Sequence, residues 1–260
     1  MIKMLKNWKS AFVSYNMIKI RGDPGVNRPK KQEKDLPDFY LTHMQFPKEN
    51  RQNVIVFLLL FMDLLGVLPL LSDPFHRGFF WAGMIPVILM HIWGIVYLVA
   101  PFKFERSYFL YMGVLGVAVA YLYFIVSQKL MYVNVGVEGP LYAVISAVLL
   151  VAALIFFQIF NYRMLYSGTY DRLDEDPSSF NLSPIITASS IGYIVAQFLI
   201  SLTVSQSFKM MVLVAAYSVL ILIMAYIATY LHRYMYILQN PEQLKSMYSG
   251  FGRPKKERMR

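Results

Sequence analysis

Two apolar runs separated by a short polar break occupy residues 53–100 of the chain. The first run reads NVIVFLLLFMDLLGVLPLL, the break is SDPFHRG, and the second run reads FFWAGMIPVILMHIWGIVYLVA. A helix of roughly 20 residues crosses a hydrocarbon core about 30 Å thick, so each run is long enough to span a membrane. Because the break between them is short, the sequence predicts two antiparallel neighbouring helices.

Four further apolar runs follow, and together they predict an all-α fold, that of a polytopic membrane protein with six transmembrane helices. The composition agrees, since only 15% of the residues are charged, against about a quarter in a typical soluble domain. The absence of cysteine excludes disulfides, thiolate metal ligands and cysteine nucleophiles. The predicted helices lie near residues 53–71, 79–100, 107–127, 140–162, 183–206 and 210–235.

Positive charge is concentrated on one side of this predicted topology. If both termini share a side, that side holds all of the 25 Lys and Arg residues except Arg77, Lys129 and Lys209. Cytoplasmic loops carry an excess of Lys and Arg, so we expect the N- and C-termini to be cytoplasmic. The net charge of +10 then indicates contact with anionic lipids at the basic cytoplasmic face, and no nucleic acid is expected.

The chain divides into four predicted segments. Residues 1–20 place apolar side chains at helical spacing among lysines, which predicts a basic amphipathic helix in the lipid interface. Packing of that helix on the protein's own surface or on a partner fits the same periodicity. Residues 21–52 read as a polar cytoplasmic linker, 53–236 as the transmembrane domain and 237–260 as a basic cytoplasmic tail. With no signal-peptide pattern, we expect a bacterial cytoplasmic (inner) membrane protein.

Each of the first two runs carries one ionisable residue near its middle, Asp63 and His91. Counted from Asn53 and from Pro101, both lie roughly 15 Å from the same membrane face at a helical rise of 1.5 Å per residue. Ionisable groups at that depth cost several kcal/mol unless they are paired or hydrated, so we predict an intramembrane polar pair. Such a pair can relay protons or hold a cation, because imidazole titrates near neutral pH. A structural role, in which each residue only fixes helix packing, stays open.

The fifth run has two adjoining rows of residues with a spacing of four. Small residues in one row let helix backbones approach closely, and polar residues in the other row form hydrogen bonds across the contact. We interpret this stripe as the packing face of a central helix, and the alternative is a polar path lined by Tyr193 and Gln197. Gly116 and Ala120 in the third run repeat the small-residue spacing more weakly. The stripe consists of Ala188, Ser189, Gly192, Tyr193, Ala196, Gln197 and Ser201.

Tyrosine is abundant, with 19 residues, and many of them lie near the ends of the predicted runs. Tyrosine is enriched where a membrane meets water, so we interpret these residues as interfacial belts. They are Tyr97, Tyr108, Tyr132, Tyr162, Tyr166, Tyr234 and Tyr236.

Motifs of common enzyme classes do not occur in the sequence. It has no HExxH zinc motif, no GxSxG nucleophile elbow and no P-loop or dinucleotide-binding glycine pattern. The acidic residues of 171–176 are adjacent rather than helically spaced, which favours a solvated loop over a metal site. We therefore predict no catalytic residue, metal site or cofactor.

The leading hypothesis is a non-enzymatic integral membrane protein, because the predicted loops are too short to form a soluble domain. It would be a helical-bundle subunit of a transport, secretion or protective membrane assembly, with the lipid bilayer and other membrane-protein subunits as partners. A second hypothesis is an autonomous small-solute or proton-coupled transporter that uses Asp63 and His91. An enzyme acting on lipid-linked substrates is the least favoured class.

Overall fold

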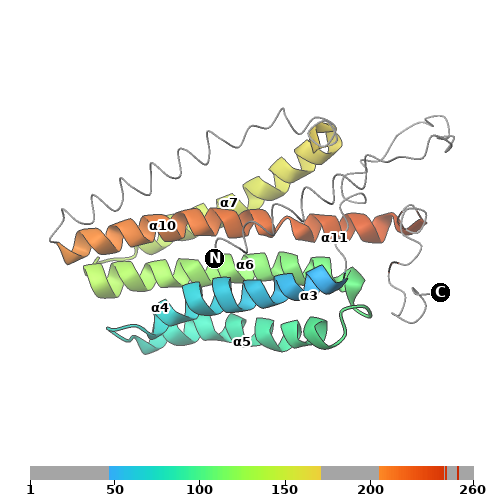
Figure 1. The fold of residues 1–260 in the computed structure, drawn as a ribbon. Coiled ribbons are helices and arrows are strands. Elements are labelled where there is room, and N and C mark those ends of the chain that lie inside the picture. Colours follow the sequence, from blue (N-terminus) through green and yellow to red (C-terminus); the bar gives the residue numbers. More distant parts are fainter. Residues whose placement is uncertain (1–46, 171–204, 243, 245–250, 252–260) are drawn as a thin grey trace, which may run out of the picture. The chain divides into compact units, whose positions relative to one another are not determined.

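The computed structural model describes residues 47–170 and 205–242, together with residues 244 and 251. Regular structure in this part of the chain is entirely helical, without strands (Figure 1). Two of the segments, η1 and η2, are π-helical. In chain order the elements are α3 (Pro47–Val56), η1 (Phe57–Val67), α4 (Leu68–Leu71), α5 (Arg77–Val99), α6 (Glu105–Lys129), η2 (Leu130–Val135), α7 (Leu141–Tyr166), α10 (Gln206–Ile227) and α11 (Tyr230–Gln239).

Five helices formed by these elements are long and apolar enough to cross a membrane. The all-α prediction is thus confirmed for the described residues, and five of the predicted runs correspond to these helices. The helices are Glu49–Leu71, Arg77–Val99, Glu105–Val135, Leu141–Tyr166 and Gln206–Gln239. The predicted run at 183–206 falls almost entirely outside the described residues, and so do residues 1–20. The number of spans and the side on which each terminus lies therefore stay predictions.

The third helix is longer than the predicted 107–127, because α6 passes directly into η2 and helical structure ends only at Val135. The sequence prediction ends this helix near residue 127 and places Lys129 outside the membrane, on the side opposite the termini. Gln128 and Lys129 are buried instead, at 3% and 1% exposure, and both form hydrogen bonds to neighbouring helices. A polar residue with such partners does not need to leave the hydrocarbon region.

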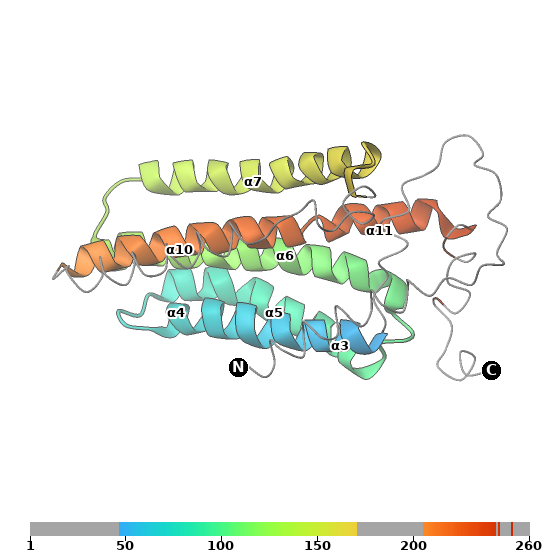
Figure 2. The same ribbon diagram turned by 45° about the horizontal axis from the view of Figure 1, so that its top comes forward.

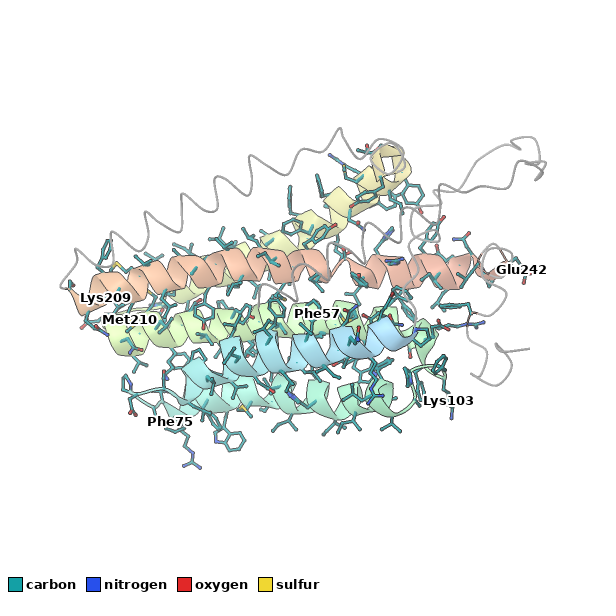
Figure 3. The ribbon with its side chains drawn as sticks, viewed as in Figure 1. Phe57, Phe75, Lys103, Lys209, Met210 and Glu242 are labelled. Carbon is teal, nitrogen blue, oxygen red and sulfur yellow. The ribbon has the colours of Figure 1, made fainter. Side chains whose placement is uncertain are left out.

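The polar ends of the helices lie on opposite sides of the bundle. Figure 3 shows Lys103 and Glu242 at one end, and Lys209 with Phe75 at the other. Lys103 belongs to the connection between α5 and α6, whereas Phe75 belongs to the connection between α4 and α5. The consecutive helices Glu49–Leu71, Arg77–Val99, Glu105–Val135 and Leu141–Tyr166 therefore run antiparallel, as short connections require.

α6 is the central helix of the described bundle. It packs against η1 and α5 on one side and against α10 and α11 on the other (Figures 1 and 2). The contact with α10 is close because α6 presents Gly116 there. A β-carbon on Gly116 would lie 2.6 Å from the backbone nitrogen of Ala228 and 2.9 Å from the carbonyl oxygen of Met224. Only glycine permits this distance between the two backbones.

α7 lies at the edge of the bundle, where it packs on α6 and α10. Two glutamine side chains connect it to these helices. Nε2 of Gln128 donates to Ser146 Oγ at 2.8 Å, and Nε2 of Gln158 donates to the carbonyl of Ala228 at 2.8 Å. Toward the C-terminal end of α7, the ring of Tyr162 contacts the ring of His232 on α11, with centroids 5.6 Å apart. α7 and the α10–α11 helix therefore run in the same direction.

Candidate functional site

Asp63 on η1 and His91 on α5 face each other across the contact between their helices. Nε2 of His91 lies 3.2 Å from Oδ2 of Asp63, so the structure brings together the two ionisable residues that the sequence singles out. Each residue is at least roughly 10 Å from the nearer end of its helix at the rise of about 1.5 Å per residue. The pair, called the acid–imidazole pair below, thus lies well inside the apolar length of both helices.

The contact made by Nδ1 of His91 shows which ring nitrogen faces Asp63. Nδ1 lies 2.9 Å from the carbonyl oxygen of Val87, and a carbonyl only accepts hydrogen bonds, so Nδ1 carries a proton. Nε2 is then the nitrogen that faces the Asp63 carboxyl. A hydrogen bond between Nε2 and Oδ2 requires a proton on one of these two atoms.

The acid–imidazole pair is not enclosed by the described bundle. Of the two side chains, 35% of His91 and 38% of Asp63 remain exposed. Exposed aliphatic residues surround the pair on both helices, among them Leu60 on η1 and Ile92 on α5, at 42% and 62% exposure. The other carboxyl oxygen, Asp63 Oδ1, receives no hydrogen bond from the part of the chain that the structure describes. The pair therefore faces outward.

Two tyrosines hold the backbone of η1 on either side of Asp63. Tyr123 on α6 donates to the carbonyl of Phe61 at 2.8 Å, and Tyr217 on α10 donates to the carbonyl of Leu65 at 2.8 Å. In a π-helix each N–H reaches the carbonyl five residues back, and such segments occur frequently at functional sites. The two hydroxyls thus secure η1 from inside the bundle while Asp63 points to His91 on α5.

Lys129 is a buried cation that the sequence interpretation did not identify, since it was assigned to an exposed end. Its Nζ donates to the carbonyls of Pro69 at 2.8 Å and Leu70 at 3.1 Å, and to that of Ser72. These carbonyls belong to the C-terminal end of α4, where backbone acceptors lack helical partners and the helix dipole is negative. One feature of the sequence indicates that Lys129 does not end the helix. The residues that follow it, LMYVNV, are mostly apolar and continue the helix past the lysine.

Three of the tyrosines interpreted as interfacial belts lie inside the bundle instead. Tyr97, Tyr108 and Tyr236 are 1%, 1% and 2% exposed. Two of their hydroxyls have partners in the protein: Tyr97 donates to the carbonyl of Ser107 at 2.9 Å, and Tyr108 accepts from Asn53 Nδ2 at 3.2 Å. These two hydroxyls therefore do not need the membrane–water interface. Tyr162 and Tyr166 are exposed, at 50% and 47%, which fits the belt interpretation.

The remaining predicted site residues lie outside the described residues. These are Ala188, Ser189, Gly192, Tyr193, Ala196, Gln197 and Ser201. Within the described residues, no group of three or more His, Cys, Asp or Glu side chains is placed to hold a metal ion. The acidic residues of 171–176 are not among those described.

Comparisons with protein-family models, with curated proteins and with solved structures give no match for this chain. Its function is therefore inferred from the arrangement of the bundle and the acid–imidazole pair.

Proposed function

We propose that this protein is a non-enzymatic subunit of a membrane assembly and that it binds a partner membrane protein over the acid–imidazole pair. The observation that carries this proposal is the position of Asp63 and His91: paired at 3.2 Å within the apolar length of two helices, yet more than one third exposed. Ionisable residues in membrane helices almost always face a protein interior or a water-filled cavity. A partner helix lying over η1 and α5 would provide that interior.

The partner is a transmembrane helix that carries a hydrogen-bond donor. Asp63 Oδ1 has no donor among the described residues, so a hydroxyl, amide or basic side chain on the partner would complete its hydrogen bonding. Interhelical hydrogen bonds of this kind contribute about 0.6 kcal/mol on average in a membrane, and more in favourable cases. The aliphatic residues around the pair would supply the van der Waals part of the contact. An assembly for transport, secretion or protection of a cell membrane would use such a subunit.

The proposal includes six crossings, with both termini in the cytoplasm of a bacterial cell. α7 and α10 run in the same direction. If both cross the membrane, the chain between them has to return across it an odd number of times. The predicted run at 183–206 supplies one return, and the Lys and Arg distribution favours cytoplasmic termini.

Single-cysteine crosslinking in native membranes tests the partner contact, because the chain has no cysteine of its own. Leu60→Cys, labelled with a benzophenone maleimide, places the photoreactive group beside the pair. The matched control is Val148→Cys on α7, a residue with 62% exposure on the far side of α6. We expect a discrete adduct from position 60, none from position 148, and loss of the adduct when Asp63→Asn is added.

Purification of the Asp63→Asn variant as a monodisperse, folded protein is the control for that loss. An adduct that persists undiminished in the folded Asp63→Asn variant would contradict the proposal. So would the absence of any adduct from Leu60→Cys in cells that express the protein at its natural level.

A proton-coupled transporter is the second candidate, and the contact of His91 Nε2 with Asp63 Oδ2 at 3.2 Å favours it. Purified protein in liposomes distinguishes the two candidates. The subunit proposal predicts no proton or solute flux by this protein alone. Flux by the wild-type chain that disappears in His91→Gln, with the protein still folded, would favour the transporter.

A further inference from the structure

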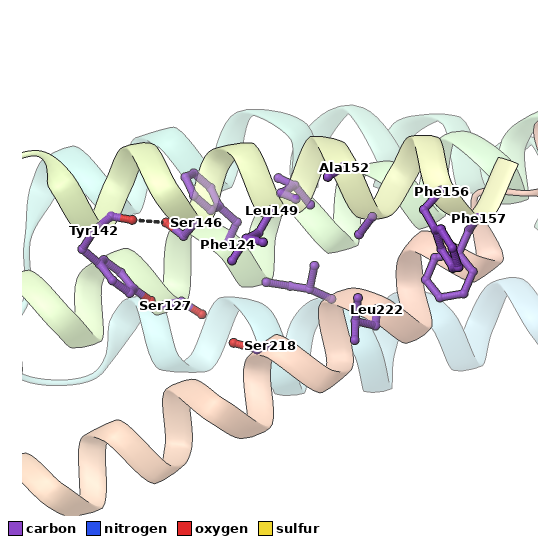
Figure 4. A pocket seen from close by; sticks show the side chains of 13 residues that line it. Phe124, Ser127, Tyr142, Ser146, Leu149, Ala152, Phe156, Phe157, Ser218 and Leu222 are labelled. Atoms are coloured by element: carbon purple, nitrogen blue, oxygen red, sulfur yellow. Dashed lines mark hydrogen bonds between the residues drawn. The ribbon is translucent and has the colours of Figure 1, made fainter. Parts of the chain in front are cut away.

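A cavity lies between α6, α7 and α10, away from η1 and α5, which hold the acid–imidazole pair (Figure 4). Its volume is about 530 Å³, within the range of roughly 300–1,000 Å³ that is typical of small-molecule sites. All of its lining residues belong to helices long and apolar enough to cross a membrane. An occupant would therefore enter from the bilayer.

One end of the cavity gathers hydroxyl groups from three helices. Ser127 comes from α6, Ser146 from α7 and Ser218 from α10. Each of them donates its own proton to the carbonyl four residues earlier in its helix, at 2.9, 2.6 and 3.0 Å respectively. A serine that has used its proton can only accept further hydrogen bonds. The three serines therefore offer acceptors, and Tyr142, which lines the same end, adds a hydroxyl that can donate or accept.

Gln128 lies behind the serine end of the cavity and does not line it. Its side chain is 3% exposed, and its Nε2 donates to Ser146 Oγ at 2.8 Å, which places the amide directly behind a residue that lines the cavity. Its Oε1 is buried and accepts no hydrogen bond. Because Gln128 does not line the cavity, its amide holds Ser146 Oγ at the cavity wall and does not itself meet an occupant.

The rest of the cavity is hydrocarbon and aromatic. Figure 4 shows Leu149 and Leu222 in its middle, and Phe156 and Phe157 at the end opposite the serines. These side chains have nothing to donate or accept, and they match an aliphatic chain. The cavity thus has an acceptor-rich end and an apolar end.

We propose that this cavity binds a single-chain lipid from the bilayer whose head carries a hydroxyl donor, such as a long-chain alcohol. The hydroxyl donates at the serine end, beside Gln128, and the chain lies along α7 toward Phe156 and Phe157. Apolar volume selects the chain, and the serine oxygens that line the cavity accept from the hydroxyl. The site does not depend on the proposed partner contact, because it involves neither η1 nor α5.

Photolabelling of the purified full-length protein in phosphatidylcholine nanodiscs tests this site. The probe is a C16 alcohol that carries a diazirine in its chain, and unlabelled hexadecanol or its methyl ether serves as competitor. We expect saturable labelling of α7 peptides that hexadecanol displaces at concentrations about tenfold lower than the ether does, the ratio that corresponds to about 1.4 kcal/mol.

Two tryptophan substitutions on α7 decide whether the labelling comes from the cavity. Ala153→Trp fills the cavity, because Ala153 lines it. Val151→Trp adds the same bulk at a neighbouring residue that is 54% exposed and does not line the cavity. Saturable labelling should fall at least tenfold in Ala153→Trp and stay unchanged in Val151→Trp. Labelling that never saturates, or that is equal in both variants, means contact with ordinary surrounding lipid and overturns the proposal.

Ser218→Ala tests recognition of the hydroxyl, because it removes an acceptor that lines the cavity and whose own proton goes to the carbonyl of Val214. Ser167→Ala is the control, since Ser167 is an exposed serine after α7 that does not line the cavity. We expect the difference between the alcohol and the ether to shrink in Ser218→Ala and to stay unchanged in Ser167→Ala. Equal competition already in the wild-type protein would overturn the proposed head group.

Discussion

α6 and α7 are of nearly equal length, 25 and 26 residues, yet they occupy opposite places in the bundle. In the most apolar stretch of the α6 span 67% of the residues are buried, whereas in that of α7 none are. Apolar character alone does not separate them, since both qualify as membrane-spanning helices. In lipid, an apolar surface gains little by leaving one hydrocarbon environment for another.

The difference lies in small and polar residues. α6 presents Gly113 and Gly116 to the backbones of α10 and α11, and its polar side chains bond to the backbone of the first span. α7 has no glycine and offers mainly branched aliphatic and aromatic side chains to its surroundings. Burial in this bundle therefore follows close backbone contact and interhelical hydrogen bonding, as expected for membrane helices.

Of the changes that test this difference between α6 and α7, replacement of Gly116 by leucine should reduce the stability of the bundle most. A side chain at position 116 meets the backbone of Ala228 and Met224, which cannot move aside as a flexible side chain does. Overpacking usually costs about 1–3 kcal/mol, and a clash with backbone lies at or above the upper limit. We expect the Gly116→Leu variant to lose its monodisperse peak in fluorescence-detected size-exclusion chromatography after mild heating.

Ala147→Leu is the matched control, because Ala147 is a small, partly exposed residue on α7 that does not line the cavity. Its melting temperature should stay close to that of the wild-type protein. Equal loss of stability in the two variants would mean that closeness to α10 is not what makes α6 central.

Replacement of Lys129 by methionine should have the next largest effect. The change removes the donor shared by the carbonyls of Pro69, Leu70 and Ser72, of which Leu70 is a buried residue. Loss of one buried partner costs about 1–3 kcal/mol, so we expect a destabilisation of about 2 kcal/mol, measured as a lower melting temperature in detergent. Lys209→Met is the control, since Lys209 is exposed at the start of α10. Similar melting temperatures for the two variants would contradict a stabilising role for buried Lys129.

The helices themselves could be predicted from the sequence, but the direction in which each one faces could not. Length and apolarity located five spans to within a few residues, except where Gln128 and Lys129 continued a helix that was expected to end. Antiparallel neighbours with one ionisable residue each were enough to predict a pair of Asp63 and His91. A helix that is apolar all round has no amphipathic stripe, so its rotation is not encoded in periodicity.

The partial exposure of the acid–imidazole pair was therefore not predictable, because it depends on that rotation. The same reason explains the tyrosines at the predicted helix ends. Whether Tyr97 meets water or the carbonyl of Ser107 depends on which way α5 turns that residue toward α6. Lys129 shows that charged residues also predict helix ends incompletely. A lysine that follows an apolar run marks the membrane surface only if no buried acceptor is within reach of its side chain.

Removal of single hydroxyls should give the smallest effects and the finest test of how α6 differs from α7. Tyr123→Phe and Tyr217→Phe each remove one hydrogen bond to η1, worth about 0.6 kcal/mol on average in a membrane protein. Because the two rings touch, with centroids 5.5 Å apart, we expect the double variant to deviate from the sum of the single variants. Tyr162→Phe on α7, where the side chain is 50% exposed, should leave the melting temperature unchanged. A loss at Tyr162 as large as that at Tyr123 would show that tyrosine hydroxyls stabilise the protein from the lipid interface rather than through the backbone of η1.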